Sequence, residues 1–284
     1  MIRTTSRPDG PLMTVNASVS GPVVYLDNWA IGDLAEGDAS RRRRFIAALC
    51  SGMDLLFSVT NAAELSGPQG KSADAIRMFL DEIGPRWFPV ELDQTEVVKR
   101  ELDGADPNST CMSEGLLKSY VRSRMQEYAP DSGKIIDLSE SFFRLGAMLD
   151  WVGPQRDSIR RGSADMDEAL RNKMGTYADA SKQDARWLDL KFPRLPFNPS
   201  KPATFTYVNL VRTLIIEANP LKPGDGMDFC HAVMASTFAS FATLDKHWKR
   251  RVEALPKPNR LARIYSGAEL DTMVADIGAW ASTN

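Results

Sequence analysis

Short apolar runs alternate with amphipathic segments in the first part of the chain. Residues 23–26 (VVYL) and 55–59 (LLFSV) are rich in β-branched, leucine and aromatic side chains, which is typical of buried strands. Residues 71–83 place apolar side chains on one stripe at helical spacing, and residues 41–50 also predict a helix. A weaker apolar run at 87–90 predicts a third strand. This order of strands and helices favours a parallel sheet in an α/β domain.

Helical periodicity then dominates residues 92–220, apart from a proline-containing stretch at 192–202 that predicts an extended linker. The alternating pattern resumes near the end of the chain, with helices or strands predicted over 226–241, 241–244, 246–255, 263–266 and 268–280. We therefore predict one α/β domain formed by residues 20–91 and 221–284. A mainly helical insertion over residues 92–220 interrupts it.

Composition and charge agree with a globular protein that has a sizeable core. Hydrophobic residues make up 43% and charged residues 25% of the 284 residues, which excludes collagen-like and disordered chains. The formal net charge of −2 excludes a protein held on nucleic acid by bulk positive charge. Two compact basic runs, 41–44 and 246–251, still leave room for a localised contact with phosphate groups.

The cysteines and the hydropathy pattern bear on localisation. Cys50, Cys111 and Cys230 lie far apart and form no CxxC or Cys/His metal spacing, which favours a reducing compartment. Residues 1–20 lack the apolar core of a secretory signal, and no apolar run approaches the roughly 20 residues that a membrane helix needs. We expect a cytoplasmic protein that does not engage a membrane.

Four acidic residues stand where predicted strands end or where the neighbouring helices begin: Asp27, Glu64, Asp228 and Asp245. Ligands of open parallel sheets bind at the carboxyl ends of the strands, so these side chains are expected to converge there. Carboxylates gathered in one place repel one another and raise each other's pKa. A divalent cation removes that conflict, and oxygen ligands suit Mg²⁺ or Mn²⁺. The sequence therefore predicts a Mg²⁺ or Mn²⁺ site formed by the four acids.

The segments around these acids resemble the four motifs of PIN-domain ribonucleases. Residues 24–28 (VYLDN) are similar to the first-strand motif, and residues 61–65 (NAAEL) to the second motif, a Glu at a helix start. Residues 228–235 (DFCHAVMA) are similar to the third motif, and residues 241–246 (FATLDK) resemble the fourth, a strand that ends in Thr-x-Asp. Their order and spacing also fit that family. The resemblance covers the two α/β pieces and not residues 92–220, which small VapC-type toxins lack.

The resemblance implies a three-layer PIN-like domain with a central, mostly parallel sheet and a Mg²⁺- or Mn²⁺-dependent endonuclease, with RNA as the expected substrate. It makes the four acids both catalytic and metal-binding residues. Candidate contacts to the nucleic acid are Asn28, Thr243, Lys246, Lys249 and Arg250. An antitoxin-like protein partner and a homodimer both stay open.

Each candidate residue also has a plainer interpretation. Asp27, Glu64 and Asp245 suit helix caps or first-turn acids, and Asp225 is predicted to cap the helix that follows it. His231 lies one helical turn after the third acid and is expected to pack or support rather than to bind metal. The alternative function is a catalytically inactive PIN-like scaffold that binds nucleic acid or protein. The first strand offers no Asp-x-Asp, and no P-loop or dinucleotide fingerprint occurs, which disfavours a phosphatase or a nucleotide-dependent enzyme.

Overall fold

A five-stranded, all-parallel sheet forms the centre of the computed structural model, which describes residues 2–6, 13–17, 19, 21–106, 109–128 and 143–283. In sheet order the strands are β5 (Trp87–Pro89), β4 (Asp54–Phe57), β3 (Val23–Tyr25), β6 (Phe241–Thr243) and β7 (Arg263–Tyr265). The α/β class with a parallel sheet is thus confirmed. A separate antiparallel pair consists of β1 (Ile2–Ser6) and β2 (Met13–Ala17).

The order of the strands creates a switch point at the centre of the sheet. From β3 the chain moves outward to β4 and β5, and it returns to the other side of β3 for β6 and β7. Val24 of β3 is therefore in register with Leu55 of β4 on one side and with Phe241 of β6 on the other. Where the direction of winding reverses, the loops part at the carboxyl ends of the two strands and leave a crevice for ligands. Here the winding reverses between β3 and β6, so the carboxyl ends of these two strands are the expected place for a ligand.

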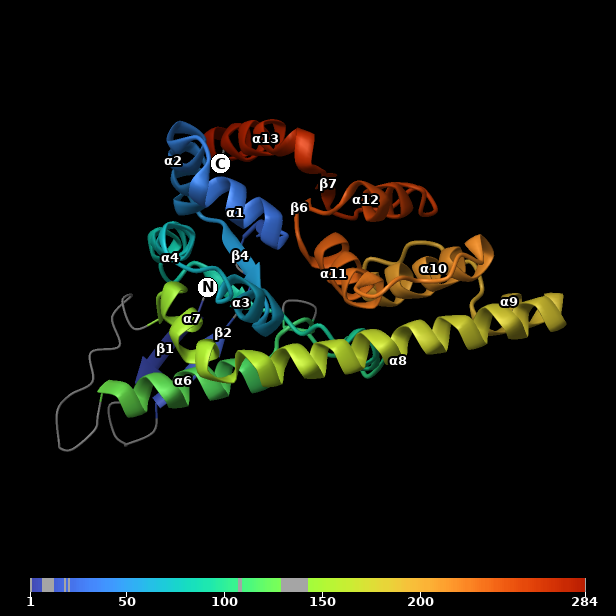
Figure 1. The fold of residues 1–284 in the computed structure, drawn as a ribbon. Helices are drawn as coiled ribbons and strands as arrows, with labels where there is room; N and C mark the ends of the chain where they lie inside the picture. Colours follow the sequence, from blue (N-terminus) through green and yellow to red (C-terminus); the bar gives the residue numbers. More distant parts are fainter. Residues whose placement is uncertain are drawn as a thin grey trace.

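One group of helices packs together on one side of the strands (Figure 1). It comprises α1 (Asn28–Glu36), α2 (Ala39–Cys50), α4 (Lys71–Ile83) and α13 (Leu270–Thr283). The helix α4 has the bounds that its apolar stripe predicts, and it buries Ile76, Phe79, Leu80 and Ile83. The helix α1 was not predicted as a separate element. It begins directly after Asp27, whose side chain accepts a hydrogen bond from the Asn28 backbone.

The second group of helices includes most of the segment 92–220 (Figure 1). Around the site it comprises α3 (Val59–Leu65), α8 (Arg156–Gln183), α10 (Pro202–Glu217), α11 (Asp225–Phe238) and α12 (Lys246–Glu253). The remaining helices of the insertion are α5 (Gln94–Leu102), α6 (Glu114–Tyr128), α7 (Gly146–Val152) and α9 (Ala185–Lys191). The 28-residue helix α8 packs against both α3 and α11, so the insertion shares a continuous core with the sheet domain.

The described part of residues 92–220 contributes helices and no strand to the central sheet. Residues 193–201 form neither helix nor strand, as the proline-containing stretch predicts. The predicted helix over 226–241 ends at Phe238, because the chain turns extended before β6 and the Ser240 backbone donates a hydrogen bond to the Val23 carbonyl at 2.7 Å. None of the described helices combines the length and the apolar character that crossing a membrane requires.

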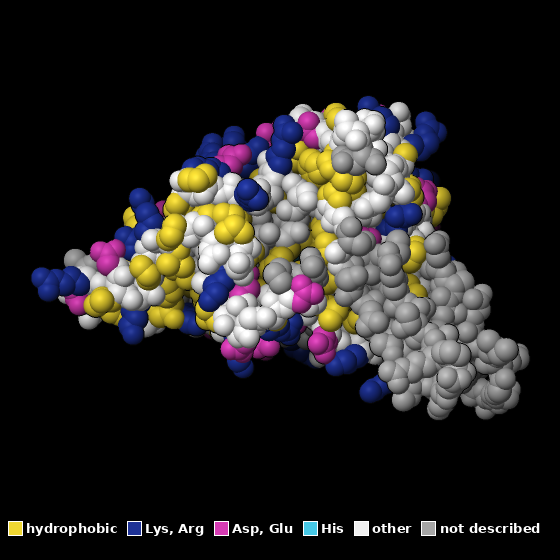
Figure 2. All heavy atoms as spheres, turned by 180° about the vertical axis from the view of Figure 1, so that it is seen from behind, with side chains coloured by type: hydrophobic (Ala, Val, Ile, Leu, Met, Phe, Trp, Pro, Cys, Tyr) yellow, Lys and Arg dark blue, Asp and Glu magenta, His cyan; other side chains and the backbone are white. Residues whose placement is uncertain are grey.

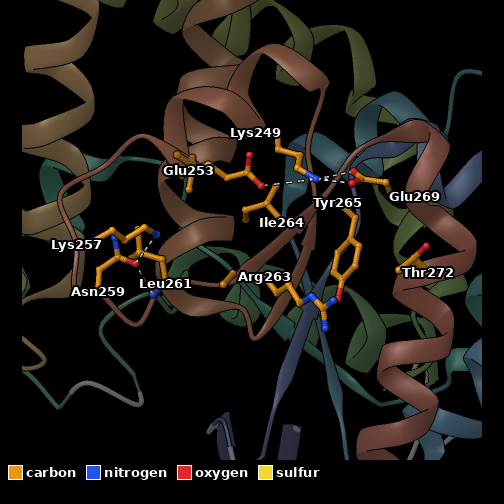
Figure 3. A pocket seen from close by; sticks show the side chains of 12 residues that line it. Lys249, Glu253, Lys257, Asn259, Leu261, Arg263, Ile264, Tyr265, Glu269 and Thr272 are labelled. Carbon is orange, nitrogen blue, oxygen red and sulfur yellow. Dashed lines mark hydrogen bonds and ion pairs between the residues drawn. The ribbon is translucent and has the colours of Figure 1, made fainter.

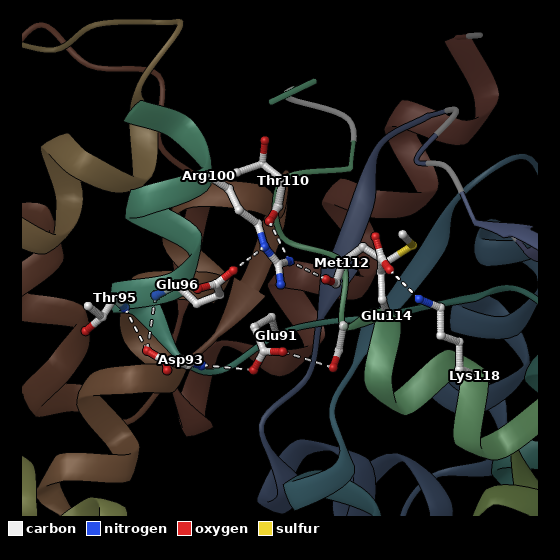
Figure 4. Close-up of polar contacts among 10 residues, drawn as sticks. Glu91, Asp93, Thr95, Glu96, Arg100, Thr110, Met112, Glu114 and Lys118 are labelled. Carbon is white, nitrogen blue, oxygen red and sulfur yellow. Dashed lines mark hydrogen bonds and ion pairs between the residues drawn. The ribbon is translucent and has the colours of Figure 1, made fainter. Parts of the chain in front are cut away.

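A network of hydrogen bonds connects the segment after β5, at the edge of the sheet, to the insertion (Figure 4). The Glu91 carboxylate accepts hydrogen bonds from the Asp93 backbone at 3.2 Å and the Ser113 hydroxyl at 3.1 Å. Asp93 in turn caps α5, and Arg100 of that helix donates to the Met112 carbonyl at 2.7 Å. These contacts fix the direction in which the insertion leaves the sheet.

Candidate functional site

The four predicted acids occupy the carboxyl edge of the sheet. Asp27 follows β3 and Asp245 follows β6, so these two flank the switch point. Glu64 lies on α3, which starts directly after β4. Asp228 lies in the first turn of α11, and this helix leads into the amino end of β6. Its first turn therefore lies toward the opposite, carboxyl edge.

The pKa values show that these side chains share one electrostatic neighbourhood. Burial raises the pKa of Asp27 to about 6, with further contributions from Glu64 and Asp245. Asp228 is exposed at the surface, yet its partial desolvation by the surrounding protein is the largest cause that raises its pKa to about 7, followed by the charges of Asp27, Asp245, Asp225 and Glu64. No lysine or arginine of the described chain is among the main influences on either pKa. Among the described residues, the main charges acting on Asp27 and Asp228 are therefore those of other carboxylates.

The arrangement of the acidic side chains bears on how a divalent ion could bind to them. As the side chains stand, the described residues contain no group of three or more His, Cys, Asp or Glu side chains arranged to hold one metal ion. The acids are close enough to feel one another's charge but do not form a closed ligand cage. Carboxylate oxygens are the ligand type that Mg²⁺ and Mn²⁺ prefer in proteins.

Thr243 holds the backbone of Asp27 across the switch point. Its hydroxyl accepts a hydrogen bond from the Asp27 N–H at 2.7 Å, and Thr243 is fully buried at the end of β6. The sequence predicts Thr243 as a contact to nucleic acid. The structure places its hydroxyl beneath Asp27, where it supports the acid.

A chain of hydrogen bonds holds Glu64 in the same region. The Asn28 side-chain amide donates to the Glu64 carboxylate, and the Asn61 amide donates to the Asn28 carbonyl oxygen at 3.0 Å. Asn61 is fixed by a capping box with Ser58: the Asn61 backbone donates to the Ser58 hydroxyl at 3.0 Å, and the Ser58 backbone donates to the Asn61 oxygen at 3.1 Å. Asn28 is thus a positioning group between β3 and α3.

A buried pair connects the strand of Asp27 to the helix of Asp228. The Tyr25 hydroxyl is hydrogen-bonded to Nδ1 of His231, and both residues are buried. Burial lowers the pKa of His231 to about 4, so its imidazole is neutral at pH 7. Tyr25 precedes Asp27 by two residues, and His231 follows Asp228 by one helical turn. His231 therefore packs and supports, as its spacing predicts.

The cations of α12 divide into free and engaged side chains. Lys246 and Arg250 are exposed and make no ion pair within the described chain. Lys249 instead binds Glu269 at 2.6 Å and lies 3.7 Å from Glu253. It lines a pocket of about 340 Å³ between α12, β7 and α13 (Figure 3). Of the three predicted cationic contacts, Lys246 and Arg250 are the ones free to meet a phosphate.

The basic run 41–44 is partly used within the fold. Arg41 binds Asp33 at 2.8 Å, and Arg42 binds Glu82 at 2.8 Å, while Arg43 and Arg44 are exposed. The first half of this run therefore stabilises the contacts of α2 with its neighbours.

The predicted cap at Asp225 is wrong. The residue before α11 is Gly224, which makes no side-chain cap bond, and the Asp225 carboxylate accepts a hydrogen bond from the Lys222 backbone at 2.6 Å instead. The carboxylate that caps this helix belongs to Asp167 of α8, which sequence reasoning missed. No local signal could reveal it, because the two partners are far apart in the chain.

Comparisons with protein-family models, with curated proteins and with solved structures each found no match. The interpretation of the site therefore depends on its residues, their burial and their charges.

Proposed function

We propose that the chain is a metal-dependent nuclease of PIN-like fold, which hydrolyses phosphodiester bonds in RNA. The observation that carries this proposal is the gathering of four carboxylates at the switch point, where burial and mutual repulsion raise the pKa of Asp27 and Asp228. The four motif-like segments fall on β3, α3, α11 and β6, which supports the PIN-like assignment. The choice of RNA rests on the motif resemblance.

The four acids have different environments, which suggests different roles in such a site. Asp27 and Asp228 are the first candidates for direct ligands, because carboxylates with raised pKa values gain most from a neighbouring cation. Asn28 holds Glu64, and one oxygen of Asp245 accepts hydrogen bonds from two backbone N–H groups of α12. A bound Mg²⁺ or Mn²⁺ would lower the pKa of a coordinated water and stabilise charge on the phosphate.

The charge of the surface supports a local rather than a general contact with nucleic acid. On the face shown in Figure 2, Lys and Arg side chains are dispersed among Asp and Glu rather than gathered in one patch. Lys246 directly follows Asp245, and Arg250 lies one helical turn after Lys246, so the free cations are on the helix that Asp245 caps. They can attract the phosphate backbone toward the carboxylates.

Metal removal tests the proposed function. We expect Mn²⁺ to raise the melting temperature of the purified chain as its concentration increases. At one hundred times its Kd, Mn²⁺ should raise the free energy of unfolding by about 2.7 kcal/mol. Cleavage of single-stranded RNA is expected only with Mg²⁺ or Mn²⁺, and EDTA should abolish both effects.

The other outcomes of this experiment are equally definite. RNA binding without Mn²⁺ stabilisation and without cleavage would contradict the nuclease and support the scaffold alternative. Cleavage of DNA but not RNA would keep the metal site and overturn the substrate.

A second prediction concerns Lys246 and Arg250. Replacing both by alanine is expected to weaken binding of single-stranded RNA and to reduce the slope of log Kd against log salt by about 1.4, since each lost phosphate contact removes about 0.7. The measurement is a titration of labelled RNA in EDTA at several salt concentrations.

The control for this pair changes the same charge elsewhere. Arg186 and Lys191 are exposed on α9, at the far end of α8 (Figure 1). Their double alanine variant should bind RNA like the wild type. An equal loss in both double variants would mean that α12 has no special role.

A further inference from the structure

A buried carboxylate from the insertion reaches the first turn of α11. Asp167 lies on α8 and is 5% exposed. One of its oxygens accepts hydrogen bonds from the backbone N–H of Gly226 at 2.8 Å, Gly224 at 3.2 Å and Met227 at 3.3 Å. Its other oxygen binds Arg171 at 2.8 Å. Burial opposes its ionisation, but Arg171 and the N–H groups outweigh burial and lower the pKa of Asp167.

The two helices touch backbone to backbone at this point. A Cβ atom placed on Gly226 would lie 2.8 Å from the Asp167 carbonyl oxygen, 2.8 Å from its carboxylate and 3.0 Å from its Cα. Real side chains do not tolerate such distances, so only glycine permits this approach. The hydrogen bonds of Asp167 therefore hold α11 at a defined distance from α8.

The contact lies next to one of the proposed metal ligands. Asp228 follows Met227 directly, within the same first turn of α11. The same helix α8 also contacts α3, which carries Glu64, and the Ser163 and Thr60 hydroxyls lie 3.4 Å apart at that contact. Figure 1 shows α8 running past both helices. One helix of the insertion thus touches the supports of two of the four acids.

We propose that Asp167 is a positioning residue for the acidic site, which holds Asp228 in place through the backbone of the first turn of α11. The insertion then has a role in the chemistry: its long helix determines how well the carboxylates bind a divalent cation. This inference rests on the proposed function.

A helix cap that only stabilises the fold is the competing explanation, and the chain supplies a matched control for it. Glu101 of α5 is also 5% exposed, and its carboxylate accepts hydrogen bonds from the Ala203 and Thr204 backbones, both at 2.8 Å. It caps α10, a helix that carries none of the four acids. Asp167 and Glu101 therefore do the same work on different helices.

The experiment compares Asp167→Ala with Glu101→Ala. Both variants are expected to lose stability, because both leave a helix terminus without its buried acceptor. Only Asp167→Ala should weaken Mn²⁺ binding, by about 10-fold in calorimetry, as loss of a supporting contact behind a metal ligand commonly does. Hydrogen exchange without metal should become faster at residues 226–229 in Asp167→Ala and remain slow there in Glu101→Ala.

Each remaining outcome decides the proposal. Wild-type Mn²⁺ affinity in Asp167→Ala, or an equal loss in both variants, overturns it. If Asp167→Ala does not fold, Gly226→Ala keeps the carboxylate but forces the helices apart, and it should weaken Mn²⁺ binding; unchanged affinity overturns the proposal. If the wild type binds no Mn²⁺, the proposed function fails, and hydrogen exchange at 226–229 alone decides whether Asp167 holds this turn.

Discussion

Asp228→Asn is expected to make the folded protein more stable above pH 7 while removing its response to Mn²⁺. A substitution that stabilises the fold and inactivates the site separates the two effects of this carboxylate. The pKa of Asp228 is raised from 3.8 to about 7 in the folded protein, so ionisation opposes folding. The variant removes that charge and one of the proposed metal ligands together.

The direction of the pH effect follows from the raised pKa. Between about pH 4 and pH 7 the folded state binds more protons than the unfolded state, so the free energy of unfolding falls as the pH rises. The destabilisation is absent below pH 4 and complete above pH 7. Because Asp228 is in contact with solvent, we expect a gain of about 1 kcal/mol for Asp228→Asn at pH 8 and none at pH 4.

Thermal unfolding at the two pH values, with and without Mn²⁺, measures this prediction. A gain of about 1 kcal/mol corresponds to about 2–4 °C in a protein of this size. We expect Mn²⁺-dependent cleavage to fall by about 100-fold or more, since loss of a ligand costs at least as much as loss of a group behind it. Asp165→Asn removes an exposed carboxylate of α8 and should change neither property. Lower stability of Asp228→Asn at pH 8, or wild-type stabilisation by Mn²⁺, would contradict the assignment.

The sequence was sufficient to predict elements with strong local patterns. The helix α4 was predicted with its observed bounds because its apolar residues recur on one face. The strands β3, β4 and β6 were predicted because short apolar runs end at polar residues. Their parallel arrangement then placed the acids at one edge, because parallel strands share their carboxyl ends.

The supports of the acids could not be predicted, because they depend on contacts between distant segments. Thr243 and Asp27 are neighbours only because β6 lies beside β3. Asp167 reaches α11 only because α8 passes so close to that helix that only a glycine, Gly226, fits at the contact. A hydroxyl or a carboxylate has the same local appearance whether it binds substrate, caps a helix or holds another residue in place.

An ion pair between a buried arginine and a half-buried glutamate connects α12 to the insertion. Arg251 is 5% exposed, and its guanidinium donates to the Glu217 carboxylate of α10 from Nη2 at 2.6 Å and from Nε at 3.0 Å. The guanidinium also lies over the Trp248 ring, 4.6 Å from its centre. Asp245 caps the start of α12, and the same helix carries the free cations, so this pair fixes the helix that connects them. The insertion therefore holds the site at α12 as well as at α11.

Arg251→Ala is expected to destabilise the protein by about 2 kcal/mol, because it removes the hydrogen bonds to the half-buried Glu217 and a buried side chain packed on Trp248. Arg251→Lys should not restore stability, since an ammonium group cannot form the paired hydrogen bonds or stack in the same way. Denaturant unfolding measures both.

Arg77 provides the control, because it also binds a carboxylate through two nitrogens, at 2.6 and 2.5 Å. Its side chain is 42% exposed, so Arg77→Ala should cost at most about 1 kcal/mol. Similar losses in Arg251→Ala and Arg77→Ala would mean that α12 is held by its own contacts with the sheet, and that the insertion is dispensable for this side of the site.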